Sequence, residues 1–166
     1  MKKRLILISV LLAAVIAAGC AHMTVRHLRR DPWVLEQPRE LTMKFWRFEY
    51  QVVPMRDRFG VRGTAYPLQS VPEWADWVRD LWMAVYMADE NSHVIADDIR
   101  VFVPQELDRE NGLDFEFILK PGGLGAGDKL YVTFGYRMVL ARSPADSDES
   151  GKAPEVFFAS EGALSN

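Results

Sequence analysis

The stretch Leu130-Tyr131-Val132-Thr133-Phe134-Gly135-Tyr136-Arg137-Met138-Val139-Leu140 contains the longest alternation of apolar side chains in the chain. Successive side chains of an extended strand point to opposite faces, so this period of two predicts a strand with one buried face. That face carries Val132, Phe134, Tyr136 and Met138, whose size lets them form much of a core.

The preceding apolar stretch, residues 113–119, alternates in the same way and carries Phe115 and Phe117 on one face. Glycine-rich residues 121–128 join it to residues 130–140, which favours an antiparallel hairpin of these two strands. We expect their apolar faces to meet Trp46 and Phe48 across the core.

Four other segments have strand character. Residues 46–52, 59–66 and 94–103 contain alternating or β-branched apolar side chains, and Pro54 ends the first of them. Residues 80–88 have the apolar density of a central strand and are followed by a turn cluster at residues 89–92.

The segment before residue 80 allows two interpretations. Ser70-Val71-Pro72-Glu73 has the spacing of a helix capping box, with proline at a position that starts helices. The helix either runs to Met87, with Trp74, Trp77 and Leu81 on one face, or covers only residues 72–78 and precedes a strand. We favour the short helix because residues 81–86 are too uniformly apolar for one face of a surface helix.

Residues 41–141 therefore predict a mainly β domain, an antiparallel immunoglobulin-like β-sandwich of about six to seven strands with one short helix. Residues 20–40, which show no sustained period, are expected to be a tether. Residues 142–166 are rich in Ser, Asp, Glu and Gly and are expected to be a disordered tail, although Val156-Phe157-Phe158 is apolar.

The N-terminus has the pattern of a secretory signal. Lys2, Lys3 and Arg4 precede an apolar run over residues 5–16, which is too short for a lasting membrane span. The run ends at Ala17-Ala18-Gly19-Cys20, which holds the only cysteine of the 166 residues.

This N-terminal pattern resembles the signal and lipobox of bacterial lipoproteins, although family members usually have Leu where Ala17 stands. The resemblance implies removal of residues 1–19, diacylglycerol on the sulfur of Cys20 and acylation of the new amine. Acyl chains contribute about 0.8 kcal/mol per buried CH₂, so two or three of them hold a protein on a lipid bilayer. In enterobacterial lipoproteins an Asp directly after the cysteine commonly marks retention in the inner membrane. Residue 21 is Ala, which favours the outer membrane, facing the periplasm. The alternative is an ordinary cleaved signal that leaves Cys20 free.

The mature chain would carry 17 basic and 23 acidic side chains, a formal net charge of −6. An exported acidic protein is a poor match for nucleic acid. Residues 80–103 distantly resemble the FxLyD-type sandwich domains of bacterial envelope proteins, a resemblance that implies a fold and no catalytic residues.

Patterns that carry chemistry are weak. Glycine-rich residues 122–129 lack the helix and the Ser or Thr of a phosphate loop, and His22, His27 and His93 lack the spacing of a zinc site. Asp97 and Asp98 are adjacent, so on a strand they should face opposite sides. The chain has no Gly-x-Ser-x-Gly motif. We therefore expect a non-enzymatic protein without a metal or another cofactor.

The remaining candidate is an aromatic group, Trp74, Trp77, Trp82 and Tyr86. These side chains could dock a partner or line a ligand groove, or they could simply fill the core, as tryptophans beside a sheet usually do. We expect a lipid-anchored interaction or envelope-assembly module with an envelope protein as partner. The alternative is a carrier of a small apolar ligand that uses Trp74, Trp77 and Trp82.

Overall fold

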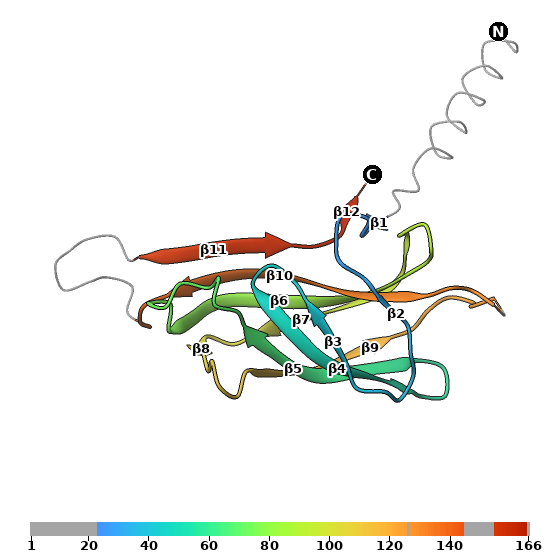
Figure 1. Ribbon diagram of the computed structural model, residues 1–166, viewed down its shortest axis with the longest axis horizontal. Coiled ribbons are helices and arrows are strands. Elements are labelled where there is room, and N and C mark those ends of the chain that lie inside the picture. The colour runs from blue at the N-terminus through green and yellow to red at the C-terminus, as the bar shows by residue number, and fades with distance from the viewer. Residues whose placement is uncertain (1–22, 126, 145–154, 166) are drawn as a thin grey trace, which may run out of the picture.

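The computed structural model describes residues 23–125, 127–144 and 155–165, in which the regular elements are all strands (Figure 1). In chain order they are β1 (Met23–Thr24), β2 (Asp31–Pro32), β3 (Arg39–Thr42), β4 (Trp46–Pro54), β5 (Phe59–Pro67), β6 (Trp77–Ala88), β7 (Val94–Phe102), β8 (Gln105–Glu106), β9 (Leu113–Leu119), β10 (Tyr131–Ala141), β11 (Val156–Glu161) and β12 (Leu164–Ser165).

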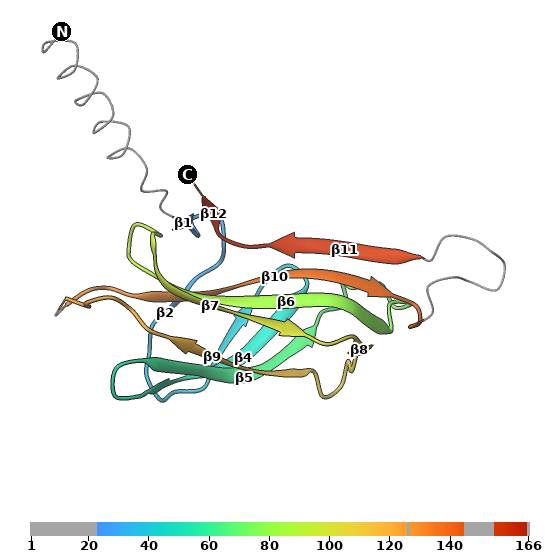
Figure 2. The same cartoon turned by 180° about the vertical axis from the view of Figure 1, so that it is seen from behind.

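Two antiparallel sheets pack face to face, which confirms the predicted β-sandwich (Figure 2). Sheet I has the order β11-β10-β6-β7, with β2 paired to the start of β10 and β8 paired to the start of β6. Sheet II has the order β3-β4-β5-β9. β1 and β12 pair only with each other.

The core between the sheets is built around Phe134 of β10, on the face that the alternation predicts. Its ring stacks on Phe48 of sheet II, with centroids 4.2 Å apart and planes 4° from parallel. The rings of Tyr50 and Phe115, also in sheet II, approach it edge-on at 5.2 and 5.6 Å. Such pairs contribute beyond the burial of their apolar area, so these four rings hold the sheets together.

The expected hairpin of residues 113–119 and 130–140 is wrong. β9 pairs with β5 in sheet II, whereas β10 pairs with β6 in sheet I, and the glycine-rich connection crosses from one sheet to the other. Phe115 and Phe134 therefore meet across the core instead of lying side by side in one sheet. Trp46 and Phe48 lie across the core from β10, as expected. They do not lie across the core from β9, because Phe115 belongs to the same sheet as they do.

The predicted short helix is absent from residues 72–78. Only one turn forms there, closed by the Ala75 amide donating to the Pro72 carbonyl at 3.0 Å, and β6 begins at Trp77. A helix nucleus costs free energy that only further turns recover, and here the chain enters a twelve-residue strand instead. The strand assignment for residues 80–88 is confirmed, and the longer helix to Met87 is wrong.

The described part of the predicted tether, residues 23–40, belongs to the folded domain. Val25 and Leu28 are buried, and the ring of Trp33 meets that of Phe59 at 5.4 Å. The sequence shows no hydrophobic periodicity there because this segment runs from sheet I to sheet II and contributes single buried side chains instead of one apolar face.

The prediction of a disordered tail is wrong for residues 156–161, which form the edge strand β11. β11 pairs with β10 from Val156 opposite Ala141 to Glu161 opposite Tyr136. Phe157 packs against Phe45, with ring centroids 5.2 Å apart, so the short apolar segment supplies the burial that the polar tail lacks. Residues 145–154 lie outside the described residues.

Both open sides of the sandwich are closed by polar side chains. At the β11 side, Glu161 accepts hydrogen bonds from the Tyr136 hydroxyl at 2.6 Å and the Lys44 amide at 3.1 Å. At the other side, where β7 lies beside β9, Arg100 donates to the Glu116 carbonyl and Asp98 accepts from the Ile118 amide, both at 2.8 Å. These bonds satisfy backbone groups of β9 that have no ladder partner on that edge.

We predict that Phe134→Ala lowers the free energy of unfolding by about 3–5 kcal/mol, because it removes the central ring and leaves a cavity. Glu116→Ala is the control, since this side chain is exposed on the outer face of sheet II, and it should cost less than about 0.5 kcal/mol. Urea unfolding monitored by tryptophan fluorescence measures both. Equal losses would show that the core is assigned to the wrong face of the strands.

Candidate functional site

The predicted aromatic group does not form one cluster. Trp77 and Trp82 are half-buried on the outer face of sheet I, which is the face turned away from sheet II. Trp74 lies in the turn before β6, with the Arg142 guanidinium 5.7 Å from its ring centre. The structure therefore brings Trp77 and Trp82 to one surface and places Trp74 in the preceding turn.

Tyr86 shares the outer face of sheet I but is only 5% exposed. The backbone near Gly162 and Ala163 crosses over its ring, and burial raises the pKa of its hydroxyl, against a backbone hydrogen bond at Ala163 that lowers it. Tyr86 is thus an internal contact for the C-terminal segment and offers no surface to a ligand.

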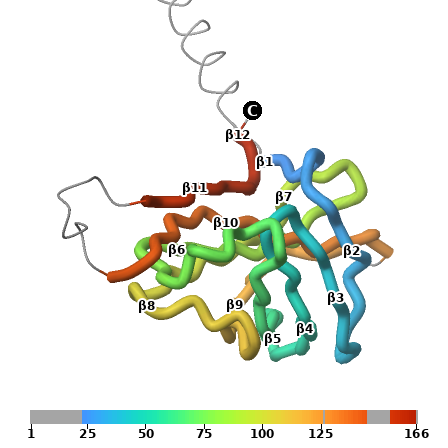
Figure 3. The backbone as a smooth tube through the Cα atoms, turned by 60° about the vertical axis from the view of Figure 1, so that its left-hand side comes forward, coloured from blue at the N-terminus to red at the C-terminus, as the bar shows by residue number. Residues whose placement is uncertain are grey.

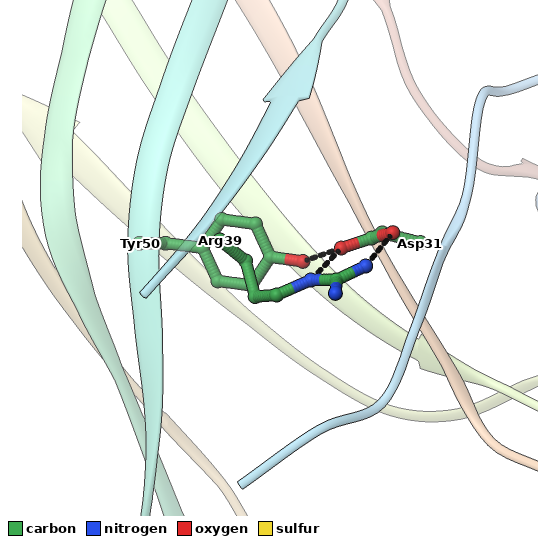
Figure 4. Close-up of polar contacts among 3 residues, drawn as sticks. All are labelled: Asp31, Arg39 and Tyr50. Carbon is green, nitrogen blue, oxygen red and sulfur yellow. Dashed lines mark hydrogen bonds and ion pairs between the residues drawn. The ribbon is translucent and has the colours of Figure 1, made fainter. Parts of the chain in front are cut away.

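A second candidate is a polar cluster that the sequence did not reveal, formed by Asp31, Arg39 and Tyr50 (Figure 4). Two guanidinium nitrogens of Arg39 donate to the Asp31 carboxylate, Nε to Oδ2 at 2.7 Å and Nη2 to Oδ1 at 2.5 Å. The Tyr50 hydroxyl donates to the same Oδ2 at 2.8 Å. Asp31 comes from β2 at the edge of sheet I, while Arg39 and Tyr50 come from sheet II, so the cluster joins the two sheets.

Electrostatics in this cluster favour the charged carboxylate. The hydrogen bonds from Arg39 lower the pKa of Asp31, and the bond from Tyr50 adds to this, while partial burial opposes it. Burial and the neighbouring carboxylate raise the pKa of the Tyr50 hydroxyl, which stays protonated and acts as a donor. With each group committed to the others, the cluster is a structural brace and leaves no free acid or base for catalysis.

A shallow groove runs over the outer face of sheet II beside this brace. Most of its lining residues are polar, and on the outer face Arg62 lies among the acidic residues Glu40, Glu49, Asp114 and Glu116. The Thr64 hydroxyl donates to Asp114 at 2.7 Å across neighbouring strands. An open and predominantly acidic surface suits a polar partner with complementary charges, because such contacts fix register and partner choice.

The acidic pair behaves as the alternation predicts. Asp98 faces sheet II and bonds to the β9 backbone, whereas Asp97 lies on the outer face, opposite Tyr86 in the ladder. Burial and the neighbouring Asp98 raise the pKa of Asp97. Within residues 23–125, 127–144 and 155–165, no three His, Cys, Asp or Glu side chains come together as a metal site.

Comparisons with family models, with curated proteins and with solved structures find no match to this chain. In the part of the chain that the structure describes, no helix is long and apolar enough to cross a membrane. Cys20 lies outside the described residues, so its lipidation stays a prediction.

We predict that Asp31→Asn lowers the free energy of unfolding at pH 7 by about 1–3 kcal/mol, because it removes charge-assisted hydrogen bonds. The pKa of Asp31 is lower in the folded than in the unfolded chain, where it is about 3.9, so its contribution is present above that pH. The contribution is lost as the pH falls through the folded-state value, and the difference between variant and parent should then close.

Urea unfolding at several pH values between about 7 and 2.5 measures this, spanning the unfolded carboxyl pKa. Glu49→Gln is the matched control, because its ion pair with Arg47 is exposed and such pairs contribute little. A stability difference that is the same at every pH would mean that Asp31 does not act through its charge.

Proposed function

We propose that the protein is a lipid-anchored, non-enzymatic interaction module of the bacterial envelope, attached through Cys20 to the outer membrane and facing the periplasm. The N-terminal lipobox pattern supports the anchor. The groove of sheet II is the surface that we assign to a protein partner.

The observation that carries this proposal is the position of the two termini. β1 pairs with β12, and both lie over sheet I, on the side away from sheet II (Figure 3). The described chain begins at Met23, three residues after Cys20. An anchor there holds the sheet I side toward the bilayer and turns the groove of sheet II toward the periplasm.

The chemistry of the groove favours binding over catalysis. Its charged side chains are mostly acidic, and the Thr64 hydroxyl and the Asp114 carboxylate are already hydrogen-bonded to each other. Its open shape and mixed charge fit the surface of another protein, which needs electrostatic complementarity more than a deep cavity.

The alternative of an apolar-ligand carrier stays a prediction. A carrier needs an enclosed, largely apolar cavity. The sheet II groove is open and lined largely by charged and polar residues, whereas Trp77 and Trp82 lie on the outer face of sheet I.

We predict that Cys20→Ser abolishes lipid modification, so the protein no longer sediments with washed membranes. Incorporation of radiolabelled palmitate into the parent chain, and its loss in the variant, measures the modification directly. The serine hydroxyl cannot replace the thiol as acyl acceptor, so continued sedimentation of the variant would show that something other than the lipid holds the protein there.

We also predict that a photo-reactive amino acid at the position of Arg62, in the groove, forms a crosslink to a protein in intact cells. The same residue at the position of Arg137, on the outer face of sheet I, is the control and should give no protein adduct. Mass spectrometry identifies the adduct. Adducts at Arg137 alone would assign the partner to the opposite sheet and overturn the groove assignment.

A further inference from the structure

The outer face of sheet I carries an exposed apolar patch that spreads over its four strands and is interrupted by Arg137 beside Trp82 and by Asp80 beside Val139. Val101 of β7 is 74% exposed and lies opposite Trp82, and Phe158 of β11 is 59% exposed and lies opposite Val139. Four of the nine large apolar side chains exposed in the described residues lie on this face. They are Ile99, Val101, Val156 and Phe158.

Alternation along the strands assigns these residues to the outer face and not to the core. Leu81 and Met83 point inward, and their neighbour Trp82 points outward between Val101 and Arg137. Val139 likewise points outward between the inward Met138 and Leu140. Apolar side chains from four neighbouring strands therefore share one surface, whereas apolar side chains on a protein exterior are normally scattered singly.

The other half of the same face is covered by the two ends of the chain. The Thr133 hydroxyl donates to the Arg29 carbonyl at 2.6 Å, and the backbone near Gly162 lies over Tyr86. A side chain at Gly135 would meet Tyr86 at 2.9 Å and the Glu161 carbonyl at 3.0 Å, so glycine is what allows this close crossing. The N-terminal and C-terminal segments thus leave the domain beside the apolar patch.

We infer that the apolar patch of sheet I rests directly on the lipid bilayer, an inference that builds on the proposed lipidation of Cys20. Cys20 is three residue steps before Met23, a length of chain that can span at most about 10 Å, so an acylated Cys20 would keep this face within reach of the bilayer surface. Tethering raises the effective concentration of lipid at the patch far above that of any free protein.

The chemistry of the patch fits the bilayer interface. β-branched and aromatic side chains insert among the acyl chains, and Trp82 is a residue type that favours the headgroup level. Arg137 stands at 5.9 Å from the Phe158 ring centre, and its long stem lets the guanidinium reach headgroup phosphate while its neighbours remain in the apolar layer. The domain then lies flat with sheet II uppermost.

The test uses the full lipidated chain carrying Val101→Cys, purified from membranes and labelled with an environment-sensitive fluorophore. It is reconstituted in vesicles of phosphatidylethanolamine and phosphatidylglycerol with brominated acyl chains. We expect the label to emit at shorter wavelength and to lose intensity to bromine. Glu116→Cys, on the outer face of sheet II, is the matched control and should show neither change.

Other outcomes separate this inference from the proposal on which it rests. Labelling of the parent chain at Cys20 would show that the thiol is free, and the anchor proposal would fail. A label at position 101 that water-soluble iodide quenches and bromine does not would leave the anchor in place and overturn the bilayer contact. A label that neither iodide nor bromine quenches, together with a disulfide-linked dimer formed by unlabelled Val101→Cys, would assign the patch to a second copy of the chain. That result would overturn the bilayer contact as well.

Discussion

The contact between Phe134 and Phe48 is the interaction on which the rest of the fold depends. It joins the central strand of sheet I to a central strand of sheet II at 4.2 Å, and the rings of Tyr50 and Phe115 enclose it. Without a disulfide, the described domain relies on such burial for most of its stability. Phe134 must point inward, and β10 pairs with β6, which pairs with β7. The position of Phe134 therefore also fixes which side chains of β6 and β7 point into the core.

Burial alone leaves the two long sides of a sandwich open, and this protein closes them with polar side chains. Asp31 and Arg39 bridge one side, and Glu161 bridges the same side nearer β11. Asp98 and Arg100 bridge the other side by bonding to the backbone of β9. These contacts satisfy edge groups that could otherwise pair with another chain, so they protect the domain from edge-to-edge association.

Periodicity in the sequence predicted the elements that alternate and missed those that do not. Residues 46–52, 113–119 and 130–140 were predicted as strands because each has one apolar face, and β4, β9 and β10 form there. The pairing of β9 with β5 was not predictable, because a glycine-rich loop serves a hairpin and a crossing between sheets equally well. Of the candidate surface residues, Trp77 and Trp82 were identified from the sequence as members of an aromatic group. The Asp31 brace was missed because nothing local links a charged residue in an irregular segment to Tyr50, nineteen residues later.

The direction in which the chain ends leave the domain follows from a single small residue. Gly135 lets the C-terminal segment cross close over β10, which brings β12 to β1 above sheet I. That crossing covers half of the outer face and leaves the half with Val101 and Phe158 open. An apolar surface beside the chain ends and a polar groove on the opposite sheet give the domain two unlike faces. With the anchor that we propose at Cys20, such an arrangement would separate attachment from recognition, because the lipid and the proposed protein partner would then occupy different sheets.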